Sequence, residues 1–347
     1  MIVVTLYTRK NCSLCDQTQT HLAALQETIP HRLNMVDVDD DPKLAARYGV
    51  SLPVVVVGPY TLKAPIEPKD LAITLQAVQL GQQQNAQIDA DLAEGRLDLG
   101  LTWTRADRFS LWMGKHYLAF VTALVAVYLF GAFLPALLAK AGLATPANVF
   151  YKAYSYVCHQ LPYRSWFLFG EQTAYPRALA GVTGLLTFEQ ATGISESTEP
   201  DAVWTARVYI GDERIGYKVA LCQRDVAIYA AIIFFGLVFA AWRRFWPGRP
   251  IRPLHWMLWI LIGIVPIGLD GGSQLVSQYM PVLTNYLPVR ESTPFLRSLT
   301  GFLFGFSTAW FGIPYMEESF GETLRIYSRK KMLYDQQLRK GAKESES

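Results

Sequence analysis

Residues 7–15, "YTRKNCSLC", follow the largely β-branched run "IVVTL" and place two cysteines two residues apart near the start of the chain. Apolar residues recur at helical spacing after Cys12, so the pattern predicts a strand followed by a helix that opens at the cysteine pair. Such a pair is typical of half a zinc site or of a thiol–disulfide couple. Zinc would need two more ligands, and His21 and His31 have no matching spacing. The pattern therefore favours redox chemistry.

Apolar runs bounded by turn residues predict further elements along the first 80 residues. They are a strand at 33–38, a helix at 42–48, a strand entered through Pro53 in "VSLPVVVVG", a further strand, and a helix at 69–80. The order strand, helix, strand, helix, strand, strand, helix is thioredoxin-like. We therefore predict an α/β thioredoxin-like N-terminal domain at residues 1–81.

A strand, a Cys-x-x-Cys pair that opens a helix, and a later proline before a strand together resemble the glutaredoxin family. The resemblance covers about the first quarter of the chain. It implies that Cys12 is the nucleophile, that Cys15 is the resolving thiol, and that Pro53 is the cis-proline opposite the pair. A helix N-terminus and the nearby cations Arg9 and Lys10 would stabilise the Cys12 thiolate.

The resemblance also implies reaction partners. Glutathione or thioredoxin would be the electron donor, and a disulfide-containing protein or a small thiol would be the partner of Cys12. The sequence departs from the family at Leu14, where tyrosine is usual, and it shows no clear Gly-Gly-Asp glutathione clamp after the third strand.

The rest of the chain is much more apolar. Hydrophobic residues make up 51% of the sequence and charged residues 18%, and long uncharged windows occur only beyond residue 116. About 20 apolar residues in a helix cross the hydrocarbon core of a bilayer. We predict an α-helical membrane domain at residues 117–316, with four spans at 117–139, 226–242, 253–269 and 298–316. The uncharged residues 271–289 contain Gln, Asn and Pro, and they suit a re-entrant or surface segment better than a span.

Charge predicts the orientation of the spans. The connection "RRFWPGRPIR" at residues 243–252 carries four arginines, which favours the cytoplasmic side. Residues 82–116 form a polar linker and an amphipathic juxtamembrane segment, and residues 317–347 form a basic tail. The sequence shows no signal peptide. Its formal net charge of +3 is small, which does not favour nucleic acid as a partner. We therefore expect a multi-pass protein of the plasma membrane, with both termini cytoplasmic, the lipid bilayer as a partner and no nucleic acid.

Polar residues and cysteines gather at the opposite ends of the predicted spans, in what we expect to be an extracytoplasmic loop insert and its neighbours. They are Cys158, His159, Gln160, Arg164, Cys222, Arg224, Asp225, Asp270, Gln274, Arg290 and Arg297. Within the insert, residues 203–221 suggest a β-hairpin that turns at Gly211 and Asp212.

Four of these segments resemble the DUF2085 family of bacterial integral membrane proteins. The motifs are Cys-His-Gln-x-Pro-x-Arg-Ser, Cys-x-Arg, Asp-Gly-x-x-Gln, and Arg-x-Ser with Leu-Arg-x-x-Thr-Gly, and they arrive in order across roughly residues 110–320. Asp225 stands where the family has a second cysteine. The resemblance implies a bacterial membrane protein and supplies no reaction.

Three interpretations of the outer residues stay open. Cys158, His159, Cys222 and Asp225 could hold a metal. Cys158 and Cys222 could form a disulfide. The arginines and Asp270 could pair in a structural or ligand-binding cluster.

Our leading hypothesis for the whole chain is a membrane-anchored protein with a cytoplasmic thiol–disulfide oxidoreductase domain. The alternative is a transporter, or a lipid- or small-molecule-binding membrane protein with an outer polar or metal site, that the redox domain regulates.

Overall fold

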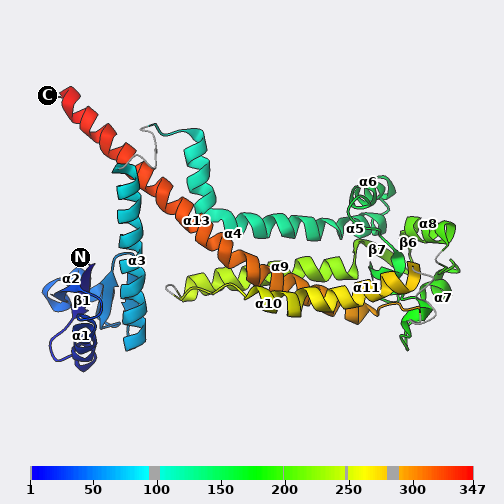
Figure 1. The fold of residues 1–347 in the computed structure, drawn as a ribbon, viewed down its shortest axis with the longest axis horizontal. Helices are drawn as coiled ribbons and strands as arrows, with labels where there is room; N and C mark the ends of the chain where they lie inside the picture. The colour runs from blue at the N-terminus through cyan, green and yellow to red at the C-terminus, as the bar shows by residue number, and fades with distance from the viewer. Residues whose placement is uncertain (1, 94–101, 198, 247–248, 280–288, 347) are drawn as a thin grey trace. The chain divides into compact units, whose positions relative to one another are not determined.

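The computed structural model describes residues 2–93, 102–197, 199–246, 249–279 and 289–346 (Figure 1). The chain divides into two compact units. One comprises Met1–Leu111, Trp242–Pro250 and Glu322–Ser347, and the other comprises Trp112–Ala241 and Ile251–Gly321.

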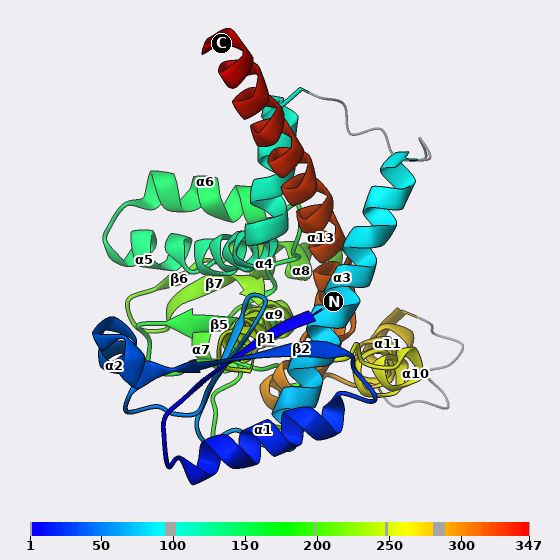
Figure 2. The same cartoon turned by 90° about the vertical axis from the view of Figure 1, so that its left-hand side faces the viewer.

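The first unit contains a mixed four-stranded sheet in the order β2-β1-β3-β4. Figure 2 labels two of its strands, β1 and β2. The strands are β1 (Ile2–Thr8), β2 (His31–Asp37), β3 (Val54–Val57) and β4 (Tyr60–Lys63). The helices are α1 (Ser13–Leu25), the short 3-10 turn η1 (Val38–Asp40), α2 (Pro42–Tyr48) and α3 (Pro68–Ala93). β1 is parallel to β2 and antiparallel to β3, and β3 is antiparallel to β4. This arrangement is consistent with the predicted thioredoxin-like domain.

Alternating side chains of the strands form the core of this domain. Val4 and Leu6 of β1 pack with Leu22 of α1 and with Leu71 and Leu75 of α3, and all five are fully buried. Helix α3 is longer than the predicted helix at 69–80. It continues past residue 81, the predicted end of the domain, to Ala93. The Gln-rich sequence after Leu80 contains good helix formers and no proline, so nothing in it stops the helix.

Among the described residues, three helices are long and apolar enough to cross a membrane. They are Arg105–Lys140, which joins α4 (Arg105–Gly131) to α5 (Leu134–Lys140), then α9 (Gln223–Phe245), and Trp256–Gln278. The third comprises α10 (Trp256–Trp259), the π-helical turn η4 (Ile260–Ile264) and most of α11 (Val265–Tyr279). Residues 271–279 are thus helical, whereas 280–288 of the expected re-entrant or surface segment lie outside the described residues.

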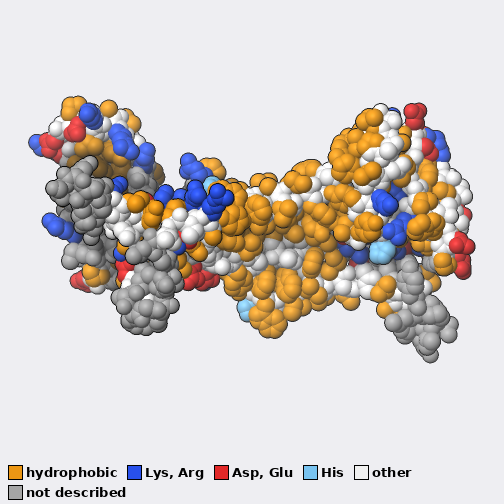
Figure 3. All heavy atoms as spheres, turned by 90° about the horizontal axis from the view of Figure 1, so that it is seen from above, with side chains coloured by type: hydrophobic (Ala, Val, Ile, Leu, Met, Phe, Trp, Pro, Cys, Tyr) orange, Lys and Arg blue, Asp and Glu red, His pale blue; other side chains and the backbone are white. Residues whose placement is uncertain are grey.

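The fourth predicted span, 298–316, lies within the long helix α13 (Pro294–Glu346). This window is not among the three apolar helices, because its serines, threonines, glycines and Pro314 lower its mean hydropathy. Hydrophobic side chains nevertheless cover much of the surface of the helical part of this unit (Figure 3). Phe120, Leu124, Val127 and Phe130 of α4 are all exposed, which suits contact with lipid.

Helices α9 and α13 approach closely through two glycines. A Cβ atom at Gly301 would lie 2.5 Å from the carbonyl oxygen of Arg224, and one at Gly305 would lie 2.2 Å from that of Ile228. Small residues let helix backbones meet in this way inside membranes. The contact places the first turn of α9 beside the start of α13, which is where the outer polar residues lie.

A small folded region lies between α5 and α9. Its elements are α6 (Ala144–Tyr154), η2 (Pro162–Arg164), β5 (Ser165–Leu168), η3 (Ala178–Ala180), α7 (Phe188–Thr192), α8 (Pro200–Val208), β6 (Gly211–Asp212) and β7 (Gly216–Cys222). The strands form an antiparallel sheet in the order β5-β7-β6. Buried aromatic side chains, including Tyr163, Phe167 and Phe188, form its core.

The hairpin predicted for residues 203–221 is only partly correct. Its first half is part of helix α8, which begins at Pro200. Proline suits the first helical position because the N–H group that it lacks would have no acceptor within the helix. The turn lies at residues 213–215 rather than at Gly211 and Asp212. The Asp212 carboxylate fixes that turn, because it accepts hydrogen bonds from the backbone N–H groups of Arg214 and Ile215.

Candidate functional site

The cysteine pair of the first unit lies at the N-terminus of α1. Cys12 is the N-cap residue and Cys15 lies in the first turn, and the two form a disulfide. Asn11 just before them has a positive φ of 62°, a left-handed conformation that asparagine tolerates and that turns the chain from β1 into the helix. The predicted cis peptide bond before Pro53 is present.

The two sulfurs have different surroundings. Cys12 is partly exposed, whereas Cys15 is only 1% exposed. The backbone N–H of Cys15 donates a hydrogen bond to the Cys12 sulfur over 3.3 Å. A donor and a helix N-terminus at one sulfur both favour its thiolate. The geometry suits an accessible Cys12 and a protected Cys15.

Arg9 contributes less charge to Cys12 than we expected from the sequence. Its guanidinium forms two hydrogen bonds to the Asp39 carboxylate, at 2.7 and 2.8 Å. The hydrogen bond to Arg9 lowers the pKa of Asp39, and the hydrogen bond to Asp39 raises the pKa of Arg9. The two charges therefore largely neutralise each other. The helix N-terminus and the Cys15 N–H therefore favour the Cys12 thiolate without help from Arg9.

The polar residues and cysteines that we predicted to cluster at the span ends lie close together in the second unit. A cavity of about 400 Å³ is lined by nine of the eleven predicted residues, all except Asp270 and Arg290, together with Val157, Leu161 and Leu275. The cavity lies where the chain after α6, the end of β7, the first turn of α9 and the facing sides of α11 and α13 meet. Predicted residues that are far apart in sequence thus lie around one space.

The two predicted residues outside the cavity wall join it through an ion-pair network. The buried Asp270 carboxylate accepts from Arg224 and, over 3.1 Å, from Arg290. Ser292 donates a further hydrogen bond to it over 3.0 Å. Asp270 therefore holds Arg224 at the cavity wall.

A second carboxylate, Glu291, was not among the predicted residues. It accepts from Arg164, Arg177 and Arg297, and its side chain is 1% exposed. Charge balance could have revealed it, because the predicted set has four arginines against Asp225 and Asp270. This imbalance predicts a further acid nearby. Glu291 is the middle residue of the Arg-x-Ser motif, between Arg290 and Ser292.

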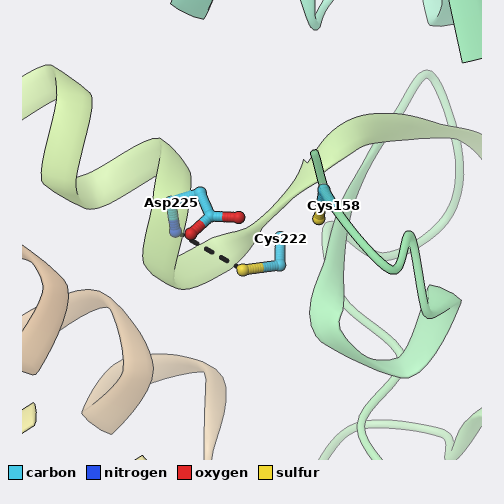
Figure 4. Close-up of side chains that lie close together, drawn as sticks. All are labelled: Cys158, Cys222 and Asp225. Atoms are coloured by element: carbon cyan, nitrogen blue, oxygen red, sulfur yellow. Dashed lines mark hydrogen bonds between the residues drawn. The ribbon is translucent and has the colours of Figure 1, made fainter. Parts of the chain in front are cut away.

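Three potential metal-ligand atoms lie close together beside the cavity (Figure 4). The Cys158 and Cys222 sulfurs and an Asp225 carboxylate oxygen all lie within 4.8 Å of one another. Both cysteines are free thiols. A hydrogen bond from the Cys222 thiol lowers the pKa of Cys158, and the same contact, together with burial, raises the pKa of Cys222. His159 lines the cavity but is not part of this group.

Lys218 of β7 is another functional group that the sequence analysis missed. Its ammonium donates to the backbone carbonyls of Gln160, over 3.1 Å, and Arg207, and the residue is 1% exposed. Burial lowers its pKa to about 7. The signal was a single lysine inside the apolar run "GYKVALC". Gln160, which has a φ of 54°, also donates to the Tyr151 carbonyl and so braces the loop that carries Cys158.

Comparison with known proteins finds a family match in each of two stretches of the chain. Residues 3–92 match the family described as "Glutaredoxin-like domain (DUF836)", and residues 214–311 match "Predicted membrane protein (DUF2085)". The chain joins a glutaredoxin-like domain to a DUF2085 membrane domain. Both predicted resemblances are confirmed, although the matched DUF2085 stretch is shorter than the range we inferred and excludes the motif at Cys158.

The glutaredoxin-like match ends within α3, close to the end of that helix at Ala93. The DUF2085 match begins just before β7 and so includes Cys222, Asp225, Asp270 and Glu291. The chain is also 23% identical over 164 residues to the uncharacterized protein MJ1492 of Methanocaldococcus jannaschii. That match covers 47% of this chain and 66% of the relative, so the chain spans just under two thirds of the relative's length.

Proposed function

We propose that this DUF2085 fusion protein is a membrane-anchored thiol–disulfide oxidoreductase whose glutaredoxin-like domain carries the reaction. The observation that supports this most is the asymmetry of the pair, with Cys12 capping a helix and partly exposed and Cys15 buried behind it. An accessible sulfur at a helix N-terminus next to a protected partner suits a cycling couple better than a permanent crosslink.

In the proposed reaction, the Cys12 thiolate attacks one sulfur of a substrate disulfide, and the other substrate sulfur leaves as a thiolate. The Cys15 thiolate then attacks the Cys12 sulfur of the mixed disulfide and releases the second substrate thiolate. The Cys12–Cys15 disulfide has taken the place of the substrate disulfide, and two electrons have moved to the substrate. A dithiol protein such as thioredoxin, or two glutathione molecules, would return the pair to the reduced state.

The experiment that tests this function is disulfide-reductase turnover by the full chain in detergent micelles. Wild type and Cys12→Ser are compared with a small disulfide as substrate and thioredoxin or glutathione as donor. Activity that depends on Cys12 supports the proposal.

We further propose four spans, with residues 298–316 of α13 as the fourth, in a bacterial plasma membrane. The four arginines between 243 and 252 and the basic residues after Met316 favour the cytoplasmic side, which would place both termini inside and the α6–β7 region outside. The glutaredoxin-like domain would then face the reducing cytoplasm, where a cysteine pair can cycle.

Cysteine labelling tests this topology. In a Cys158→Ser/Cys222→Ser background, a membrane-impermeant maleimide on intact cells should label Asp201→Cys on α8 and leave Gln336→Cys on the C-terminal helix unlabelled. Both positions are exposed in the structure, so burial does not decide the result. Permeabilised cells should label both. The opposite pattern on intact cells would overturn the orientation.

A second candidate function treats the membrane domain as the active part, a transporter or small-molecule-binding protein that the redox domain regulates. The observation that favours it is the excess of positive charge beside the cavity, since in the described part of the chain five arginines share the two carboxylates of Asp270 and Glu291. Such a cavity suits an anion. Under this function, loss of Cys12 would only modulate activity, whereas Arg297→Gln would abolish it.

A further inference from the structure

We propose that Cys158, Cys222 and Asp225 form a three-ligand site for a borderline transition metal, best suited to Zn²⁺, with a fourth position open to the cavity. This inference goes beyond the proposed function and does not depend on it, because the ligands belong to the membrane domain and not to the Cys12–Cys15 pair.

The distances between the ligand atoms fit a zinc site that needs only small adjustments. The two sulfurs and the carboxylate oxygen lie within 4.8 Å of one another. Around a tetrahedral zinc ion, with usual bond lengths, such atoms lie roughly 3.6 to 3.8 Å apart. Each pair of ligand atoms would have to approach by at most about 1.2 Å, so small side-chain rotations would bring all three onto one ion.

The backbone holds the three ligands in place. Cys222 ends β7 and Asp225 lies in the first turn of α9, and the Asp225 N–H donates to the Cys222 sulfur over 3.4 Å. Cys158 follows α6, where its N–H donates to the Tyr154 carbonyl over 2.9 Å. Hydrogen bonds of this kind orient ligands before a metal arrives.

Asp270 and Glu291 each accept from arginines, whereas no ion pair to the Asp225 carboxylate is found within the described ranges. Arg224 and Arg297 line the same cavity, yet both direct their guanidiniums to Asp270 or Glu291. Among the residues that the structure describes, none donates a hydrogen bond to the Asp225 side chain. It lies against two thiols instead, which is the environment of a metal ligand rather than of an ion pair.

The ligand set selects the class of metal. Thiolates disfavour Mg²⁺ and Ca²⁺, which take oxygen ligands, and a carboxylate is a poor ligand for Cu⁺. Zn²⁺ accepts both sulfur and oxygen. Two thiolates, one carboxylate and Zn²⁺ carry a net charge of −1, which the arginines of the cavity would offset. Three protein ligands and an open position are typical of reactive zinc sites rather than of closed structural ones.

The test is zinc binding by the full chain in detergent micelles, in a Cys12→Ser/Cys15→Ser parent. The chain has four cysteines, so only Cys158 and Cys222 remain in this parent. After reduction and chelation, the parent should bind one Zn²⁺ per chain in equilibrium dialysis. Co²⁺ in place of zinc should give thiolate-to-cobalt charge-transfer bands and the intense visible bands of tetrahedral cobalt.

Single substitutions separate ligands from bystanders. Cys222→Ser and Asp225→Asn should each weaken binding by more than the roughly 10–100-fold that follows loss of a residue supporting a ligand. Asp225→Cys should retain binding with stronger charge-transfer bands, which shows a ligand position even if Asp225→Asn folds poorly. Asp201→Asn, an exposed acid on α8, should bind like the parent.

Two results would overturn the site. One is a reduced parent that takes up no zinc beyond a Cys158→Ser/Cys222→Ser variant, which would leave a disulfide as the role of the pair. The other is zinc uptake that Cys222→Ser, Asp225→Asn and Asp225→Cys all leave unchanged, with no charge-transfer bands, which would show an adventitious ion only.

Discussion

Glu291→Gln is expected to remove most of the folded protein from the membrane fraction and to lower the melting temperature of what remains in micelles. Glu291 is the buried partner of Arg164, Arg177 and Arg297. Removing one partner of a buried ion pair costs about 3–5 kcal/mol, because it leaves charge buried without compensation. A whole domain is stable by only about 5–15 kcal/mol.

Two variants control for this result. Glu213→Gln changes an exposed acid in the turn before β7 and should leave abundance and melting temperature unchanged. Arg177→Met, combined with Glu291→Gln, should recover part of the loss because it removes a buried cation that stacks on the Tyr163 ring. A Glu291→Gln protein that is as abundant and as stable as wild type would show that the network does not support the fold.

Cys12→Ser is expected to abolish disulfide-reductase turnover, by roughly 10³-fold or more, as loss of a nucleophile does in other enzymes. A serine hydroxyl at the same N-cap is not ionised at neutral pH, so no nucleophile remains to attack the substrate disulfide. Serine is itself a good N-cap, so the fold should be kept. Turnover, measured with donor and substrate in excess, checks the prediction.

Two further cysteine variants serve as controls for the Cys12→Ser result. Cys15→Ser should keep the first attack and stop at a mixed disulfide on Cys12, which mass spectrometry of the intact chain would detect. Cys222→Ser, which leaves the glutaredoxin-like domain untouched, should turn over at the wild-type rate. A Cys12→Ser chain that kept more than about a tenth of the activity would contradict a role for Cys12 as the nucleophile.

The glutaredoxin-like domain was largely predictable because its signals are local. The β-branched run before Cys12, the helical spacing after it and the proline before residues 54–57 each specify one element. The length of α3 was not predictable in the same way, because the Gln-rich residues after Leu80 suit either a helix or a linker. Arg9 was misjudged, since its partner Asp39 lies 30 residues away in the sequence.

The outer cluster was predictable as a set but not as a set of contacts. Motifs at the ends of apolar segments must meet if the segments pack together, and this identified Cys158, Cys222 and Asp270. Which acid neutralises which arginine depends on tertiary packing, so Glu291 was missed. Helix α8 was mistaken for a strand because valines and aromatic residues in a short run suit either structure. Residues 298–316 of α13 contain several polar residues, so composition alone does not decide whether this segment spans the membrane.

The reduction potential of the Cys12–Cys15 pair tests the central claim most directly. It is measured on the full chain in micelles, in a Cys158→Ser/Cys222→Ser background, by equilibration with defined ratios of oxidised and reduced thiol followed by alkylation. A cycling couple should titrate reversibly with two electrons and a midpoint between roughly −270 and −180 mV, the range of thioredoxin-like oxidoreductases. A pair that does not titrate reversibly, or that has a midpoint below about −300 mV as structural disulfides do, would contradict the proposed function.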